Sequence, residues 1–274
     1  MINIFDLHND YFTELKNNKQ KTKYIKKCKK QNVSNVLSAV WTSKMSECEA
    51  LDNIRKAREF AEKNCLKFAI EDLHFCNRNN LNHIIQMNPE YIGLTWNYEN
   101  KLACGSLEYG GMTKLGVKIA KKIEESNIQI DTAHLNESSF LTFSNLTQKP
   151  ILCSHTAVHT LTNNPRNLKD YQIKIIEEYK GIIGLCFVKD FITKEKRCNI
   201  NDLLNHITYF TNKFSIKCLC IGSDFYGTKN LPKGIKNYKS LNKIQSKLTT
   251  YGFSNNAIRK IYYKNADRFF KENI

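Results

Sequence analysis

The chain has 274 residues, of which 41% are hydrophobic, and a formal net charge of +16. This length is within the range of one large domain, so we expect a single domain over residues 1–274. No apolar run approaches the ~18 residues of a membrane-spanning helix, and the opening MINIFDLHND lacks the pattern of a signal peptide. We therefore expect a cytoplasmic protein with no membrane partner.

Neither the positive charge nor the ten cysteines changes this expectation. A strongly basic protein can bind nucleic acid. Here, however, the lysines are spread along the whole chain, and the densest run, from Lys19 to Lys30, is typical of a solvated surface helix. Cysteines such as Cys153 and Cys186 lie inside apolar runs, and no C-x-x-C pair occurs. We expect no nucleic-acid partner, and reduced thiols that behave as small core residues.

Eight short apolar runs rich in β-branched residues predict β-strands. In chain order, the runs are Ile2–His8, Val33–Val40, Leu66–Glu71, Tyr91–Trp96, Ile128–His134, Pro150–His155, Gly181–Phe187 and Cys218–Asp224. Longer amphipathic segments between them predict helices, for example Asp52–Lys63 and Thr113–Ser126. A final helix is predicted over Ser254–Lys271, with Ser254 as its N-cap.

Strands that alternate with helices favour a parallel sheet with helical crossovers. Eight such units, in a length close to the ~250 residues of this architecture, predict an α/β protein of the (β/α)8 TIM-barrel class with a C-terminal helix. An open, doubly wound sheet is the alternative topology. No G-x-G-x-x-G follows the first strand, which argues against a dinucleotide-binding version of that sheet.

The functional prediction depends on the residues at the ends of the apolar runs. Five runs end in side chains that bind metals or transfer protons: His8, Glu71, His134, His155 and Asp224. The active sites of (β/α)8 enzymes lie at the carboxyl ends of the strands. We therefore expect the five side chains to meet in one active site. Each of them alone is also compatible with an ordinary turn or a hydrogen-bonded core residue.

Several of these residues suit a metal ion in particular. His8 and Asp10 form an H-x-D pair, and residues two apart on an extended chain point the same way, so both can reach one cation. Glu71 ends the segment LKFAIE, where a buried carboxylate needs a metal ion or a basic neighbour to offset its loss of water. His134 and His155 end neighbouring strands, and neutral imidazoles are common ligands of zinc and similar ions.

The remaining histidines are weaker candidates. His74 follows the glutamate by three residues and could support it. His159 lies one turn beyond His155, on a possible helix. His83 and His206 fall in helical patterns, so we expect both of them at the surface.

These side chains would support the hydrolysis of a small amide. Two divalent cations held close together lower the pKa of a water between them and polarise a carbonyl group. Glu71 suits a bridging position, because its two oxygens can each bind one cation. His8 and Asp10 would complete one cation site, and His134 and His155 the other.

Two further residues have candidate roles around the metals. Asp224 would take a proton from the water and pass it to the leaving amine. Arg166, in the segment NNPRN, is a candidate clamp for a substrate carboxylate, because a guanidinium group binds a carboxylate through two hydrogen bonds. An ordinary loop arginine is the alternative interpretation of Arg166.

At these residues the chain resembles the membrane (renal) dipeptidase family, peptidase family M19, an amidohydrolase-like group of metal-dependent barrels. The matching segments are DLHND (6–10), IE (70–71), LTWNYEN (94–100), GMTKLG (111–116), IDTAHL (130–135), SHTAVHTLTNNPRN (154–167) and GSDFYG (222–227). They are collinear and span residues 6–227.

The resemblance implies a metallo-dipeptidase with two Zn²⁺ ions, or other divalent transition metals. One ion would bind His8, Asp10 and Glu71, and the other Glu71, His134 and His155. The resemblance further implies that Asp224 and Glu71 are catalytic and that Arg166, Trp96 and Asn97 lie against the substrate. Family members use a hydroxide between the two metals to cleave dipeptides, often with a D-residue at the carboxyl side. The family includes dimers, so the resemblance is compatible with a homodimer, although the sequence does not identify the oligomer.

The chain departs from the family pattern at four positions. Trp96 replaces a frequent histidine that contacts the substrate carbonyl, Asp72 and Leu73 replace glycines, and Tyr226 replaces the second aspartate of G-S-D-F-D-G. These changes leave a specialised or inactive dipeptidase-like metal-binding protein as an alternative. A metal-dependent deoxyribonuclease of the TIM-barrel type is a further one, although such enzymes usually open with H-x-H, and this chain has HND at positions 8–10.

Overall fold

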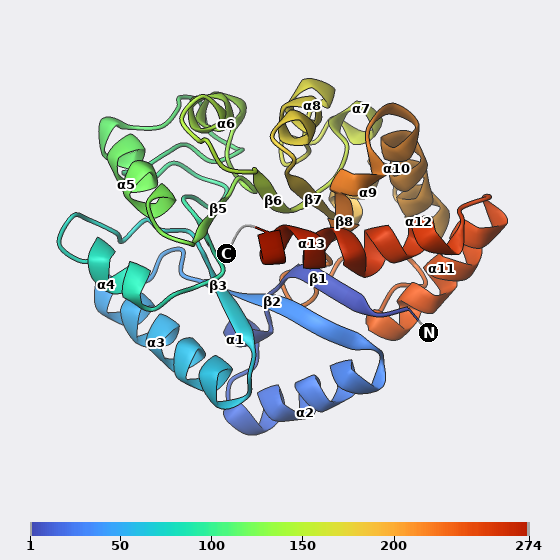
Figure 1. Ribbon diagram of the computed structural model, residues 1–274, viewed down its shortest axis with the longest axis horizontal. Helices are drawn as coiled ribbons and strands as arrows, with labels where there is room; N and C mark the ends of the chain where they lie inside the picture. The colour runs from blue at the N-terminus through green and yellow to red at the C-terminus, as the bar shows by residue number, and fades with distance from the viewer. Residues whose placement is uncertain (1, 273–274) are drawn as a thin grey trace.

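A computed structural model describes residues 2–272, in which eight parallel strands form a closed barrel in the order β1 to β8, with β8 paired to β1 (Figure 1). The strands are β1 (Ile4–Asn9), β2 (Val33–Trp41), β3 (Lys67–Glu71), β4 (Tyr91–Gly93), β5 (Gln129–Asp131), β6 (Leu152–Thr156), β7 (Ile182–Leu185) and β8 (Leu219–Ile221). Each lies within or overlaps one of the eight predicted runs. The (β/α)8 prediction is confirmed, and the open-sheet alternative is wrong.

Helices surround the barrel and connect its strands (Figure 1). They are α1 (Tyr11–Glu14), α2 (Asn18–Lys30), α3 (Glu47–Lys63), α4 (Leu81–Gln86), α5 (Lys114–Glu124), α6 (Glu137–Ser144), α7 (His159–Thr162), α8 (Asp170–Glu178), α9 (Lys189–Ile192), α10 (Ile200–Lys213), α11 (Leu241–Thr250), α12 (Asn255–Arg259) and α13 (Asn265–Glu272). Short 3₁₀ turns cover Ile216–Cys218 and Tyr238–Ser240, and a π-helical turn covers Lys260–Lys264. Among the described residues, no helix combines the length and the apolar character needed to cross a bilayer.

Four strands end earlier than their apolar runs predict. β4 stops at Gly93, β5 at Asp131, β7 at Leu185 and β8 at Ile221. His134 and Asp224 therefore lie on the loops that follow their strands, with φ of 72° and 58°. Such left-handed backbone is uncommon for residues with a side chain and clusters at functional sites. Here it turns both side chains back over the mouth of the barrel.

Polar caps define the helix starts that the sequence indicated. Ser46 and Glu49 form a capping box that starts α3 five residues before the predicted Asp52, because the cap satisfies backbone N–H groups there. Thr113 caps α5. Ser254 accepts a hydrogen bond from the Ala257 backbone, so the predicted cap of the last helix is confirmed. That helix runs through α12, the π-helical turn and α13.

The C-terminal helix α13 closes the amino-terminal end of the barrel. Phe269 and Phe270 are buried in an apolar cluster with residues of the barrel interior: Phe5, Leu7, Leu37, Ala69, Tyr91, Leu152, Ile182 and Cys220. Figure 1 shows α13 lying across the centre of the barrel. Apolar residues thus fill this end of the interior, which leaves the opposite end, at the carboxyl ends of the strands, as the place for polar chemistry. All ten cysteines are free, as expected, and eight of them are buried.

Two glycines, Gly184 on β7 and Gly222 directly after β8, allow the backbone to pack closely against Ser154 of β6. A Cβ atom added at Gly184 would lie 1.9 Å from the backbone oxygen of Ser154, and one added at Gly222 would lie 2.0 Å from the same atom. By contrast, a Cβ at Gly93, which is also buried in the barrel, meets no atom closer than 3.7 Å. The contact between β6, β7 and β8 therefore has no room for a side chain.

We expect Gly184→Ala to lower the free energy of unfolding by about 1–3 kcal/mol, because the new methyl group displaces the backbone of β6. Gly93→Ala is the matched control and should cause a much smaller loss. Urea denaturation of the two variants measures the difference. Equal losses in both would contradict the close contact at Gly184.

Candidate active site

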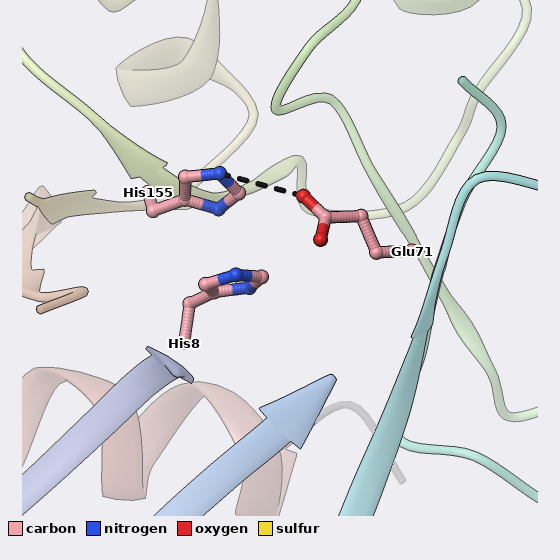
Figure 2. A group of neighbouring side chains, drawn as sticks. All are labelled: His8, Glu71 and His155. Carbon is pink, nitrogen blue, oxygen red and sulfur yellow. Dashed lines mark ion pairs between the residues drawn. The ribbon is translucent and has the colours of Figure 1, made fainter. Parts of the chain in front are cut away.

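Glu71, the last residue of β3, lies at the centre of a cluster of buried polar side chains. Its Oε1 is 2.7 Å from Nε2 of His134 and 3.7 Å from Nε2 of His155. Figure 2 shows the carboxylate pointing away from β3 toward the His155 ring. The His8 ring stacks on the His155 ring, with 3.8 Å between the centroids. All four side chains belong to residues that are at most 6% exposed.

Two aspartates complete the cluster on the side of β1. Nε2 of His8 is 3.4 Å from Oδ2 of Asp10 and 3.8 Å from Oδ1 of Asp224. One ligand atom from each of these three residues lies within 4.8 Å of the others, and the same holds for His8, Glu71 and His155. The side chains expected to meet in one site are therefore close together. The two groups share His8, whereas the two predicted cation sites share Glu71.

Each of the three imidazole rings, those of His8, His134 and His155, is held by a hydrogen bond at its Nδ1 nitrogen. In each ring Nδ1 has a partner 2.8 Å away, which is Tyr91 Oη for His8, Asn97 Oδ1 for His134 and Ser154 Oγ for His155. Nε2 of each ring is therefore the nitrogen that faces the carboxylates. Histidines that bind metals usually have their second nitrogen held by a hydrogen bond in this way, which fixes the ring's orientation.

The donor atoms fit a site for divalent cations. Nε2 of His8 and Oδ1 of Asp10 are buried and have no hydrogen-bond partner within residues 2–272. Nε2 of His134 lies 3.0 Å from Nε2 of His155, so two ring nitrogens face each other. Imidazole nitrogen and carboxylate oxygen are the ligand types that zinc and similar ions bind. A bound cation would give each of these atoms a partner.

The electrostatics of the cluster also favour bound positive charge. Burial alone would lower the pKa of His8, but the surrounding carboxylates, Asp10 first, outweigh it and raise this pKa to about 10. Burial alone would raise the pKa of Glu71, but the neighbouring basic groups, His134 first, lower it to about 2. The glutamate is therefore ionised at neutral pH, and the cluster attracts a cation.

Three other groups have the protonation states that hydrolysis requires. Burial lowers the pKa of His134 to about 4 and that of His155 well below its ordinary value, so both rings are neutral, as metal ligands must be, whereas a cation bound at His8 would displace its proton. Burial, with the adjacent Asp10 carboxylate, raises the pKa of Asp224 well above the ordinary aspartate value. A carboxyl group with a raised pKa can accept and return a proton near neutral pH.

A cavity of about 350 Å³ opens over the cluster, and the three expected substrate contacts line it: Arg166, Trp96 and Asn97. Nη2 of Arg166 is 3.0 Å from Nε2 of His155, and its guanidinium carbon lies 5.3 Å from the Phe191 ring centroid. The rings of Trp96 and Trp41, which also line the cavity, meet edge to face with 5.4 Å between their centroids. The cavity thus has a cationic wall and an aromatic wall.

The remaining histidines lie outside this cavity. Nε2 of His74 is 2.9 Å from the backbone oxygen of Met45, so this ring supports a loop and not the glutamate. His83 is exposed, as expected, and His159 is partly exposed. The prediction that His206 is a surface residue is wrong, because α10 turns it inward. Its ring is 1% exposed and accepts a hydrogen bond from a backbone N–H of the β6–α7 loop.

Sequence reasoning missed several residues around the site. Tyr91 is the first residue of a predicted strand and was given no role in the site, yet its hydroxyl reaches Nδ1 of His8. Ser154 connects Asp131 to Nδ1 of His155. Asp131 and Ser154 stand inside the segments IDTAHL (130–135) and SHTAVHTLTNNPRN (154–167), which is the signal that could have identified them. Trp41, at the end of β2, carried no comparable signal.

A closed parallel barrel with imidazoles and carboxylates gathered at the carboxyl ends of its strands defines a metal-dependent hydrolase of the barrel type. The chain belongs to the membrane dipeptidase family, peptidase family M19, whose family model matches residues 12–273. The predicted family and enzyme class, a metallo-dipeptidase, are confirmed. Membership of this metallopeptidase family implies the use of a divalent metal. The matched range begins after His8 and Asp10.

The chain is also similar to individual proteins. A protein encoded in the pqqA 5′ region of Klebsiella pneumoniae is 28% identical over 192 residues, which cover 66% of this chain and 70% of that protein. An uncharacterized dipeptidase of Schizosaccharomyces pombe is 26% identical over 164 residues, 57% of this chain and 39% of the yeast protein. A metallopeptidase of Rhodobacter sphaeroides, solved with a phosphinate mimic of the dipeptide L-Ala-D-Ala, has the same fold: its TM-score is 0.87 at 17% identity, with 100% of this chain and 99% of that chain covered.

We expect Tyr91→Phe to weaken the binding of Zn²⁺ about tenfold, because His8 loses the hydroxyl that orients its ring. Tyr262→Phe is the matched control, since Tyr262 is also a buried tyrosine whose hydroxyl donates to a backbone oxygen, that of Leu241, away from the site. Competition with a chelating dye measures the affinity of each variant. If both variants bound Zn²⁺ equally, the assigned role of Tyr91 would be wrong.

Proposed function

We propose that this chain is a dipeptidase with a binuclear zinc centre, which hydrolyses the peptide bond of dipeptides, including those with a D-residue at the carboxyl side. The observation that carries the proposal is the convergence of three imidazole Nε2 atoms on the Glu71 carboxylate, beneath a cavity with an arginine on its wall. A cavity of about 350 Å³ is near the lower limit for small-molecule sites, which suits a dipeptide and not a longer peptide.

Five residues would hold the two cations. His8 and Asp10 would hold one, His134 and His155 the other, and Glu71 would serve both. When bound, such a pair lowers the pKa of water and polarises the substrate carbonyl. The buried atoms of His8 and Asp10 that lack a partner support this assignment.

Arg166 orients the substrate by its carboxylate. Its side chain is buried at the cavity wall, and its Nε has no hydrogen-bond partner within residues 2–272. A guanidinium group in this state has donors available for the two oxygens of a C-terminal carboxylate. Anchoring that end holds the peptide bond over the cluster at a fixed distance, which restricts the site to short substrates.

Asp224 moves the proton. Its carboxylate lies 3.8 Å from Nε2 of His8, at the edge of the cavity, and burial raises its pKa. In the proposed reaction Asp224 accepts a proton from the attacking water. It then donates this proton to the amine that leaves when the peptide bond breaks. The same carboxyl group thus acts first as base and then as acid.

One solved structure of the same fold supports the proposed cleavage of dipeptides with a D-residue at the carboxyl side. The Rhodobacter sphaeroides metallopeptidase of the same fold was solved with a mimic of L-Ala-D-Ala. In the present chain, Trp41 and Trp96, packed edge to face, give the cavity an apolar wall. Small apolar side chains of either hand can pack on such a wall, since the wall makes no directional contact with the α-carbon.

The alternative, a specialised or inactive relative, depends on Trp96. Of the departures from the family pattern, Trp96 alone lines the cavity. Asp72 instead accepts hydrogen bonds from Asn100 and from the His74 backbone, and Tyr226 packs edge to face on Tyr24 at 5.0 Å. A metal-loaded protein that is inert on every dipeptide would favour this alternative.

Hydrolysis of L-Ala-L-Ala and L-Ala-D-Ala, followed by chromatography of the released alanine, tests the proposed function. We expect activity with both dipeptides after loading with Zn²⁺, and loss of activity after treatment with a chelator. Addition of Zn²⁺ should restore it. The tripeptide Ala-Ala-Ala is the control and should be cleaved poorly, because Arg166 restricts the length. Full activity in the presence of chelator would contradict the metal dependence.

We expect Asp224→Asn to lower kcat by about 10²–10⁴-fold with little change in KM or in bound zinc, because the amide cannot carry the proton. Asp190→Asn is the control, since Asp190 is an exposed aspartate of α9, outside the cavity lining. Steady-state kinetics with metal analysis of each preparation distinguish the two. Equal kcat in the variant and the wild type would show that another group transfers the proton.

A further inference from the structure

The net charge of the protein comes from two segments of the sequence. Residues 15–46 and 225–266 together carry 18 lysines and arginines and no aspartate or glutamate. At the average frequency of the chain, these 74 residues would carry about seven carboxylates. The other 200 residues hold 24 basic and 26 acidic side chains, so they are close to neutral. The lysines are spread along the chain, as expected, but the carboxylates are not.

The fold brings these two segments together beside the barrel. Two adjoining hollows of about 970 Å³ and 320 Å³ share Tyr24, Lys27 and Tyr226 among their lining residues. The lysines that line the two hollows, from α2 and from the loop after β8, are Lys19, Lys23, Lys26, Lys27, Lys30, Lys229 and Lys236. We call these seven residues and their hollows the lysine trough.

Among the described residues, the seven lysines of the trough form no ion pairs, and Glu14, at the edge of the smaller hollow, is the one carboxylate in the lining. Within residues 2–272, none of the seven lysines has a carboxylate oxygen within 4.0 Å. Elsewhere the lysines do form such pairs, for example Lys122 with Glu125 and Lys213 with Asp170. Lysine alone could be abundant by chance, but the two segments that form the trough also lack aspartate and glutamate. The positive field of the trough is therefore directed to solvent.

The trough adjoins the active-site cavity. Glu14 and Thr228 line both that cavity and the smaller of the two hollows. The hydroxyl of Tyr24, in the trough, accepts a hydrogen bond from Asn9, the residue between two of the expected metal ligands. A small molecule that leaves the trough across this rim therefore enters the cavity over the polar cluster.

We propose that the lysine trough attracts acidic dipeptides and directs them into the active site, so that dipeptides with an acidic side chain are the preferred substrate class. This inference rests on the proposed dipeptidase function. A cluster of like charges beside a cleft raises the local concentration of counter-charged substrate and its rate of arrival. The effect acts over the Debye length, which is about 30 Å at 0.01 M salt and 8 Å at 0.15 M.

The chemistry of the trough favours a small anion over a nucleic acid or a bilayer. All its basic residues are lysines, which act as hydrated point charges, whereas arginine provides the planar contacts typical of nucleic-acid recognition. The surface is hollow and not flat, and it leads into a cavity of dipeptide size. These features suit a mobile carboxylate that passes along the surface.

The test compares the triple variant Lys23→Glu, Lys27→Glu, Lys30→Glu with the triple variant Lys114→Glu, Lys118→Glu, Lys121→Glu. Both sets are exposed lysines on one helix, α2 and α5 respectively, and both change the net charge equally. The two helices lie on different sides of the barrel (Figure 1). kcat/KM is measured for Ala-Ala and Ala-Asp at low and high salt with the zinc-loaded protein.

We expect the wild type and the α5 variant to prefer Ala-Asp by about tenfold at low salt, with the preference reduced at high salt. The α2 variant should lose the preference while it cleaves Ala-Ala normally. No preference in the wild type, or an equal loss in both variants, overturns the proposal while leaving the dipeptidase function intact. A trough that binds duplex DNA or anionic vesicles, without any preference among dipeptides, overturns it as well.

If no dipeptide is hydrolysed, the proposed function fails, and the trough is tested by binding alone. Equilibrium dialysis of Asp-Asp against chelator-treated protein should give weaker binding, by about tenfold, for the α2 variant than for the α5 variant. Equal binding by the two variants overturns the trough independently of catalysis.

Discussion

The burial of carboxylates at the mouth of the barrel is the constraint on which the rest of the site depends. Glu71, Asp10 and Asp224 are each at most 9% exposed and lie around one histidine. Burying ionised groups is unfavourable unless opposite charge compensates them. In the protein alone His8 supplies part of that charge, which is why burial does not keep its pKa low. Divalent cations bound at the site would displace the His8 proton and supply the positive charge in its place, so the same requirement explains both the arrangement of the imidazoles and the chemistry of the family.

The barrel satisfies this constraint by making its two ends different. At the amino-terminal end, α13 inserts Phe269 and Phe270 among apolar residues of the interior, and this end needs no polar partner. At the carboxyl end, loops with left-handed backbone at His134 and Asp224 return side chains over the opening. Rigid strands and hydrogen bonds to each Nδ1 then fix the donor atoms before any ligand arrives. Preorganisation of this kind lowers the reorganisation needed for catalysis.

The sequence predicted the barrel and the main cluster because both depend on short-range patterns. Apolar runs mark strands, and a polar residue after an apolar run marks the end of a strand. The contact of Tyr91 was missed because its hydroxyl crosses from β4 to His8 on β1, which no local pattern records. Ser154 was missed although it stands next to His155 in a segment that the family resemblance marks. His206 was misplaced because its position on α10 is decided by which helix face packs inward. Recognising the lysine trough required both the count of carboxylates along the chain and the closure of the barrel, which brings the first and last units together.

The most direct test of the proposed binuclear site is X-ray anomalous scattering at the zinc edge from crystals grown with Zn²⁺. The account predicts two peaks, each within coordination distance of Glu71, one of them also contacting His8 and Asp10 and the other His134 and His155. Zinc found only at surface histidines or cysteines, with these five side chains bound to no metal, would contradict it.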